Sequence, residues 1–306
     1  MDGKCVVITG ATTGIGRATA LALGRLGASV LLVSRNRALG LSLARKLSAP
    51  AAGTTAEFIE ADLSSQPQVR RAAERIRERG PVIDVLINNA GARFDAHAST
   101  PDGLERTFAT NHVGHFLLTC LLLDRLTAAA GARIITLSSS AAGQARNDGR
   151  WQFGAADYDR RQAYAKSKLA NLVFAFELAR RLRGTSVQSM AVDPGLVATR
   201  FARNNGLLPW LKHLVSHGLK GELRSPAGGA DTVVFLASTT TLPPGAPGGF
   251  FCNRQLRRGP PAAYDTDVAT ELWRTSVSLC ALSPALGPAW RYIDPTPRLD
   301  QPPTAS

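Results

Sequence analysis

A tyrosine and a lysine stand four residues apart in the segment Tyr164-Ala165-Lys166-Ser167-Lys168, near the start of a predicted helix over about 162–182. Residues at this spacing share one face of a helix. A free tyrosine has a pKa of about 10, and a neighbouring ammonium favours the phenolate, so we expect Lys168 to lower the pKa of Tyr164. The pair therefore predicts a general acid/base. The same spacing is also common on ordinary helix surfaces, and Lys166, off this face, is expected to face solvent.

A glycine-rich turn follows the first apolar run of the chain, as Thr9-Gly10-Ala11-Thr12-Thr13-Gly14-Ile15-Gly16. At a strand-to-helix junction, such a turn lets backbone N–H groups and a helix N-terminus approach a phosphate closely. A simple tight turn is the other interpretation. The position of the turn at the first such junction favours a dinucleotide site.

The end of the second apolar run bears on the choice of cofactor. An acidic residue there binds the ribose of NAD, whereas an arginine accommodates the 2′-phosphate of NADP. The sequence reads Ser34-Arg35-Asn36-Arg37 and offers no acid. We therefore expect NADP(H), with NAD(H) less favoured, unless these arginines are only solvated loop charges.

Apolar runs alternate with helical patterns along the chain. Strands are expected at residues 6–8, 30–33, 58–59, 82–87, 133–137 and 186–192, and helices at 18–26, 69–76, 102–126 and 162–182. This alternation predicts an α/β fold, a doubly wound (Rossmann) parallel sheet with helices on both faces. We expect a single domain over residues 1–290, with weaker order after Gly248 and a Pro-rich tail over 291–306.

The charge of the chain is strongly basic, with 36 Lys and Arg against 23 Asp and Glu and a formal net charge of +13. The arginines are dispersed rather than clustered, so we do not expect a nucleic-acid partner. Four distant cysteines indicate neither a disulfide framework nor a metal site. The longest apolar stretch, 116–123, is far below a membrane span, and an apolar strand by residue 5 leaves no room for a signal peptide. The sequence thus predicts a soluble, cytoplasmic protein.

Taken together, these motifs resemble the classical short-chain dehydrogenase/reductase family. The resemblance covers about residues 3–280. It is carried by Gly10–Gly14–Gly16, Asp62-Leu63, Asn88-Asn89-Ala90-Gly91, Asn111, Ser138-Ser139, Tyr164 with Lys168, and Pro194-Gly195 with Thr199. The segments 164–172 and 157–161 are similar to the retinol-dehydrogenase-like branch.

The resemblance implies specific roles. Tyr164 is the expected acid/base, Lys168 holds the nicotinamide ribose, and Ser139 hydrogen-bonds the substrate oxygen. Asn111 is expected to hold a water that links Lys168 to solvent. The serine is assigned by aligning the second serine of the motif, which leaves Ser138 and Ser140 as alternatives. The implied cofactor-binding residues are Gly10, Thr12, Gly14, Ile15, Gly16, Arg35, Asp62, Leu63, Asn89, Ala90, Gly91, Tyr164, Lys168, Pro194, Gly195, Val197 and Thr199.

Two segments depart from the simplest pattern. Residues 146–161 form an insertion whose Tyr158 has no lysine four residues later, so we do not assign it the acid/base role. Residues 196–222, the expected substrate lid, are amphipathic. They suit a cap on the domain's own core, an apolar pocket wall or contact with an anionic membrane surface. His213 and His217 have metal-ligand spacing but no acidic partner, so no metal is expected.

The function that follows is an NADP(H)-dependent oxidoreductase that interconverts an alcohol and a carbonyl on an apolar aldehyde, ketone or retinoid-like molecule. The alternative is a non-catalytic NADP(H)-binding sensor with the same fold. The absence of an N-terminal apolar span sets the chain apart from membrane-anchored retinol dehydrogenases. The family also makes a homo-oligomer an expected possibility.

Overall fold

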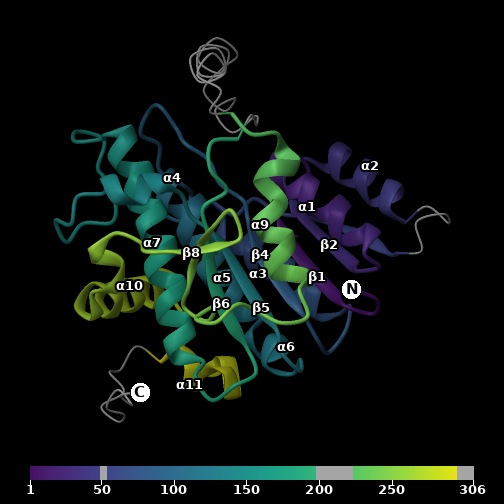
Figure 1. Cartoon of the computed structure of the whole chain (residues 1–306). Helices are drawn as coiled ribbons and strands as arrows, with labels where there is room; N and C mark the ends of the chain where they lie inside the picture. The colour runs from purple at the N-terminus through teal and green to yellow at the C-terminus, as the bar shows by residue number, and fades with distance from the viewer. Residues whose placement is uncertain (49–53, 198–222, 295–306) are drawn as a thin grey trace.

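The computed structural model describes residues 1–48, 54–197 and 223–294, which form one sheet covered by helices on both faces (Figure 1). The strands are β1 (Cys5–Thr9), β2 (Ser29–Ser34), β3 (Ala56–Glu60), β4 (Val85–Asn88), β5 (Arg133–Leu137), β6 (Gln188–Val192), β7 (Phe250–Cys252) and β8 (Gln255–Arg257). Their order in the sheet is β3-β2-β1-β4-β5-β6-β7-β8, and only β8 is antiparallel to its neighbour. The predicted doubly wound parallel sheet is confirmed.

The strand residues alternate between two apolar cores. Val6 and Ile8 of β1 pack with α1 (Gly14–Arg25), α2 (Arg37–Leu47) and α9 (Pro226–Ser238). Val7, between them, points to the other face, where α3 (Gln66–Arg77), α5 (Gly114–Leu121) and α7 (Arg160–Arg181) lie. Because both faces are covered, the strands are apolar throughout, as parallel strands usually are.

The helix expected over 102–126 is broken into pieces. It consists of α4 (Arg106–Phe108), a π-helical turn (Ala109–Val113), α5 and α6 (Leu123–Thr127). The Glu105 side chain starts it by accepting hydrogen bonds from the N–H groups of Thr107 and Phe108 at 2.6 and 2.9 Å. Such π turns often occur at functional positions, and this one contains Asn111.

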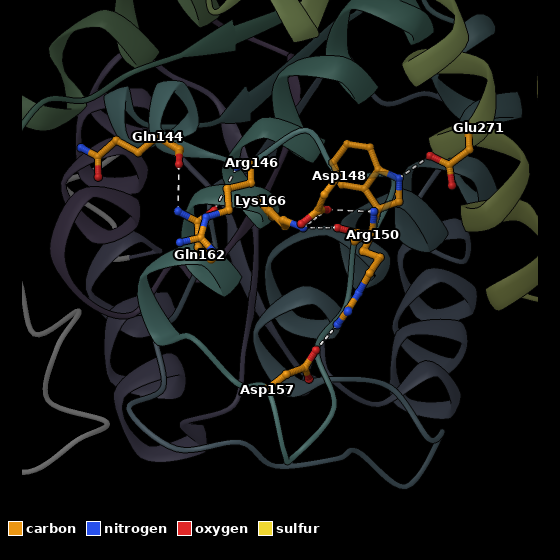
Figure 2. A network of polar contacts seen from close by, with 9 residues as sticks. Gln144, Arg146, Asp148, Arg150, Asp157, Gln162, Lys166 and Glu271 are labelled. Atoms are coloured by element: carbon orange, nitrogen blue, oxygen red, sulfur yellow. Dashed lines mark hydrogen bonds and ion pairs between the residues drawn. The ribbon is translucent and has the colours of Figure 1, made fainter.

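The insertion is anchored to one side of α7 (Figure 2). The Gln162 amide donates to the Gln144 carbonyl at 3.0 Å and accepts from the Arg146 N–H at 2.9 Å. One turn later, the Lys166 ammonium binds the Asp148 carboxylate and the Arg150 carbonyl, the latter at 2.6 Å. Lys166 is only 1% exposed. The expectation that it faces solvent is wrong, because the insertion covers this side of the helix.

Residues 249–294 form regular elements, contrary to the weaker order expected after Gly248. They add β7, β8, α10 (Thr266–Leu279) and α11 (Trp290–Ile293). The apolar residues Leu272, Trp273 and Val277 of α10 pack on the core that contains α7, and the Trp273 indole donates to the Ile293 carbonyl at 2.7 Å. The packed fold therefore reaches Asp294, past the boundary expected at 290, and residues 295–306 lie outside the description. None of the described helices combines the length and the apolar character needed to cross a bilayer.

Candidate active site

A cleft of about 620 Å³ lies where the parallel strands end, on both sides of the β1–β4 pair at which the strand order reverses. Open α/β sheets bind ligands at this position. Sixteen of the seventeen cofactor-binding residues expected from the sequence line the cleft, together with Ser139. The seventeenth, Thr199, and most of the predicted lid (198–222) lie outside the described residues.

The glycine turn packs directly against the segment after β4. Gly10 has φ +64°, and a Cβ at Gly16 would lie 2.4 Å from the Asn89 amide nitrogen and from the Gly10 carbonyl oxygen. The Asn89 amide donates to the Thr9 carbonyl at 2.7 Å. Any side chain at Gly16 would separate these two loops, so glycine is required there for packing.

Two buried histidines, His112 and His115, lie next to this region. His115 Nδ1 lies 2.9 Å from the Asn111 carbonyl oxygen, and His115 Nε2 lies 2.9 Å from Thr9 Oγ1. Burial lowers the pKa of His115 to about 4 and that of His112 to about 3, so both rings are neutral at physiological pH. A carbonyl only accepts, so Nδ1 of His115 carries the proton and Nε2 accepts from Thr9. His115 therefore links Thr9 of β1 to the π turn by hydrogen bonds.

At the adenine end, no carboxylate follows β2. Ser34 Oγ lies 2.8 Å from Thr12 Oγ1, and the next residue, Arg35, is half exposed beside Asp62, with 3.7 Å between nitrogen and oxygen. Asp62 is itself held by the N–H and hydroxyl of Ser64 at 2.9 and 2.8 Å. The acid nearest to Arg35 thus comes from the loop after β3.

Ser138 and Ser139, which follow β5, have different contacts. Ser138 is buried and its hydroxyl donates to the Lys168 carbonyl at 2.7 Å, which ties β5 to α7. Ser139 lines the cleft, and its side chain hydrogen-bonds that of Tyr164. Of the described serines in this segment, Ser139 is therefore the one placed beside the tyrosine oxygen.

Tyr164 and Lys168 both line the cleft, but their electrostatics differ from the expectation. The pKa of Tyr164 is raised to about 12, mainly by burial and also by the Asp193 charge, while Ser139 and Arg93 oppose the shift. The Lys168 ammonium lies 5.8 Å from the tyrosine ring centroid and donates to the Leu137 carbonyl at 3.2 Å. Burial lowers the pKa of Lys168 to about 8. With this pKa, the Tyr164 hydroxyl is protonated at neutral pH.

Asn111 is placed differently from the other expected residues. It is fully buried and is not among the cleft-lining residues. Its amide donates to the Ala92 carbonyl and to Ser167 Oγ, both at 2.9 Å, and accepts from the Ala92 N–H at 2.7 Å. The π turn thus directs the side chain to the backbone after β4, so that Asn111 fixes this loop.

Several cleft residues were not predicted from the sequence. Among them are Ala92, Arg93, Thr110, Ala141, Gln144 and Leu196. Each lies within a few residues of a predicted motif, so the only signal available was proximity to a strand end. Among the described residues, no cluster of His, Cys, Asp and Glu could hold a metal.

A family model, a curated protein and two solved structures are similar to this chain. The family model described as short chain dehydrogenase matches residues 4–207. Retinol dehydrogenase 12 of Mus musculus is 39% identical over 286 residues, which cover 92% of this chain and 88% of that protein. A crystal structure of an uncharacterized protein from Mycobacterium paratuberculosis is 33% identical and covers 92% of this chain and 95% of that one, with a TM-score of 0.71. The Pseudomonas aeruginosa RhlG/NADP complex is 27% identical over 82% of this chain and 94% of its own, with a TM-score of 0.65.

Proposed function

Because the chain belongs to the short-chain dehydrogenase family, in the retinol-dehydrogenase-like branch, we propose that it is an NADP(H)-dependent oxidoreductase that reduces an aldehyde or ketone to the alcohol. The observation that carries this proposal is the placement of Ser139, Tyr164 and Lys168 together in the cleft that the glycine turn opens. The reverse reaction, alcohol oxidation, uses the same residues.

The cleft suits a nicotinamide dinucleotide along its length. Thr13, Gly14 and Ile15 bring the N-terminus of α1 to the cleft, and no acidic side chain occupies its first turn, so its N–H groups are available to a pyrophosphate. Arg35 is the residue we assign to the 2′-phosphate, and Lys168 to the nicotinamide ribose. A bound cofactor of this class supplies or accepts the hydride.

The protein's own residues then act on the oxygen of the substrate. In reduction, charge develops on the carbonyl oxygen as the hydride reaches the carbon, and the Ser139 hydroxyl and the Tyr164 hydroxyl are placed to donate to it. Tyr164 then transfers its proton. A pKa of about 12 keeps the tyrosine protonated at neutral pH, which favours the reductive direction.

The catalytic assignment is tested by following NADPH absorbance with a panel of aldehydes, ketones and quinones. Tyr164→Phe is expected to lower turnover at least about 100-fold, as loss of a general acid does, with NADPH affinity unchanged. Tyr264→Phe is the matched control, because Tyr264 is exposed and does not line the cleft. Full activity in Tyr164→Phe would contradict the assignment. Tight NADPH binding without turnover on any substrate would favour the sensor alternative.

The cofactor assignment needs a separate measurement. We expect Arg35→Ala to weaken NADPH binding about tenfold or more, the effect of a charge-assisted hydrogen bond, and to leave NADH binding nearly unchanged. Arg37→Ala is the control, because Arg37 pairs with Glu60 at 3.3 Å and is not a cleft residue. Equal losses for the two cofactors would overturn the NADP(H) preference.

A further inference from the structure

The charged side chains of the cleft divide along its length. Arg35 and Asp62 stand at the adenine end, and Lys168 lies at the centre beside Tyr164. One more cation, Arg93, lines the cleft and has no part in the function proposed above. It comes from the loop after β4, a few residues past the glycine-turn contact at Asn89.

The backbone on both sides of Arg93 is fixed. The preceding residue, Ala92, has its N–H and its carbonyl both bound by the Asn111 side chain, at 2.7 and 2.9 Å. The following residue, Phe94, is buried, and its carbonyl accepts the Tyr158 hydroxyl at 2.9 Å. The Arg106 guanidinium covers the Phe94 ring at 4.2 Å. Arg93 therefore extends from a rigid segment into the cleft, as a preorganised binding group does.

Arg93 lines the same cleft as Tyr164. Its charge opposes the burial that raises the pKa of Tyr164, so the guanidinium is within electrostatic reach of the tyrosine oxygen. The neighbouring cleft wall also carries the polar side chains of Ser140 and Gln144. The described cleft lining thus combines these polar groups and the Arg93 charge with apolar residues such as Leu196, and most of the predicted lid lies outside the described residues.

We propose that Arg93 determines substrate specificity by binding a carboxylate of the substrate, so that the preferred substrates are aldehydes or ketones that also carry an acid group. This inference rests on the proposed reductase function. A guanidinium offers a planar pair of N–H donors that matches a carboxylate. The net charge of +13 acts in the same direction, because it attracts anionic substrates over a longer range.

The test compares each acid with its methyl ester. The probes are succinic semialdehyde, adipic semialdehyde and terephthalaldehydic acid, whose carboxylates lie at different distances from the aldehyde. We expect at least one acid to exceed its ester about tenfold or more in kcat/KM. Arg93→Met should remove this ratio by lowering kcat/KM for the acid about 10- to 100-fold more than for the ester. Arg93→Lys should keep part of it.

The matched control is Arg160→Met. Arg160 is half exposed, pairs with Asp95 at 3.3 Å and does not line the cleft, so its loss should leave the acid-to-ester ratio unchanged. An equal ratio in the wild type and in Arg93→Met overturns the specificity proposal and leaves the reductase function intact. A protein that binds NADPH and reduces neither acids, esters nor the wider carbonyl panel overturns both.

Discussion

Helix α7 has two faces, each with a buried lysine, and the two lysines have different surroundings. Lys168 points to the cleft, where it donates to the Leu137 carbonyl and has no carboxylate partner among the described ion pairs. Lys166 points to the opposite side, where it binds Asp148 and the Arg150 carbonyl (Figure 2). The Phe153 ring centroid lies 5.1 Å from its ammonium. Two residues along a helix are rotated by about 200°, which separates the two environments.

The contrast shows how one element serves both function and stability. Burying an unpaired ammonium disfavours the charged form and costs stability, whereas a paired and hydrogen-bonded one is tolerated. Burial of Lys168 carries that cost, and it places a cation in the cleft beside Tyr164. Lys166 and Gln162 use the other face to hold the segment that leads away from Ser139.

The largest effect is expected from Lys168→Met. Turnover should fall about 100-fold or more, because the cation beside Tyr164 is lost. Burial lowers the pKa of Lys168 from 10.5 to about 8, a penalty of roughly 3 kcal/mol at neutral pH. Removing it should therefore raise the melting temperature, since the Leu137 carbonyl keeps the Asn171 amide at 3.0 Å. A lower melting temperature would contradict the idea that burial of the Lys168 ammonium costs stability.

A change on the back face should affect stability first. Asp148→Asn leaves the buried Lys166 ammonium without its counter-charge and is expected to lower the unfolding free energy by about 2–3 kcal/mol. Lys166→Met removes the buried charge itself and leaves a half-exposed carboxylate, so we expect a smaller loss of about 1 kcal/mol. Denaturant unfolding of the two variants measures the order. A larger loss for Lys166→Met would mean that the other contacts of Lys166, such as the bond to the Arg150 carbonyl, outweigh the cost of leaving its charge unpaired.

The pH dependence should distinguish the two lysines. If the Lys168 ammonium is needed, kcat/KM for reduction falls above pH about 8, because the group loses its proton there. The same group binds fewer protons in the folded than in the unfolded state between pH about 8 and 10.5, so its contribution to stability rises over that window. Lys166→Met should leave the activity profile unchanged. A shift of the profile in that variant would show that the two faces are coupled.

The smallest effect is expected from Gln162→Ala. This side chain holds the backbone on both sides of Ala145, next to the cleft residue Gln144. We expect kcat to fall only a few-fold with KM nearly unchanged, because Ser139 is still placed by its own turn, in which its hydroxyl accepts the Ala141 N–H at 3.2 Å. Gln162→Glu is the conservative control, since it keeps the acceptor for the Arg146 N–H. A purely structural role would lower stability without any change in kcat.

Much of the fold could be predicted from the sequence because its signals are local. The apolar runs that became β1, β2 and β5 and the glycine turn are read from neighbouring residues, and their periodicity reflects burial on both faces of a sheet. The C-terminal elements were missed although Leu272, Trp273, Ser276 and Val277 follow helical spacing. Their order comes from packing against the core around α7, which no local pattern displays.

The candidate site divides in the same way. The residue types and spacing of Tyr164, Lys168 and the glycine turn pointed to a site, and the family resemblance supplied most of the cleft-lining set without coordinates. The tertiary structure decided which serine faces Tyr164, that Asn111 binds Ala92, that Lys166 is buried and that Arg93 enters the cleft. It also reversed the expected direction of the Tyr164 pKa. The physical reason is that spacing determines which residues share a helix face, whereas burial, partners and field depend on segments brought together from distant parts of the chain.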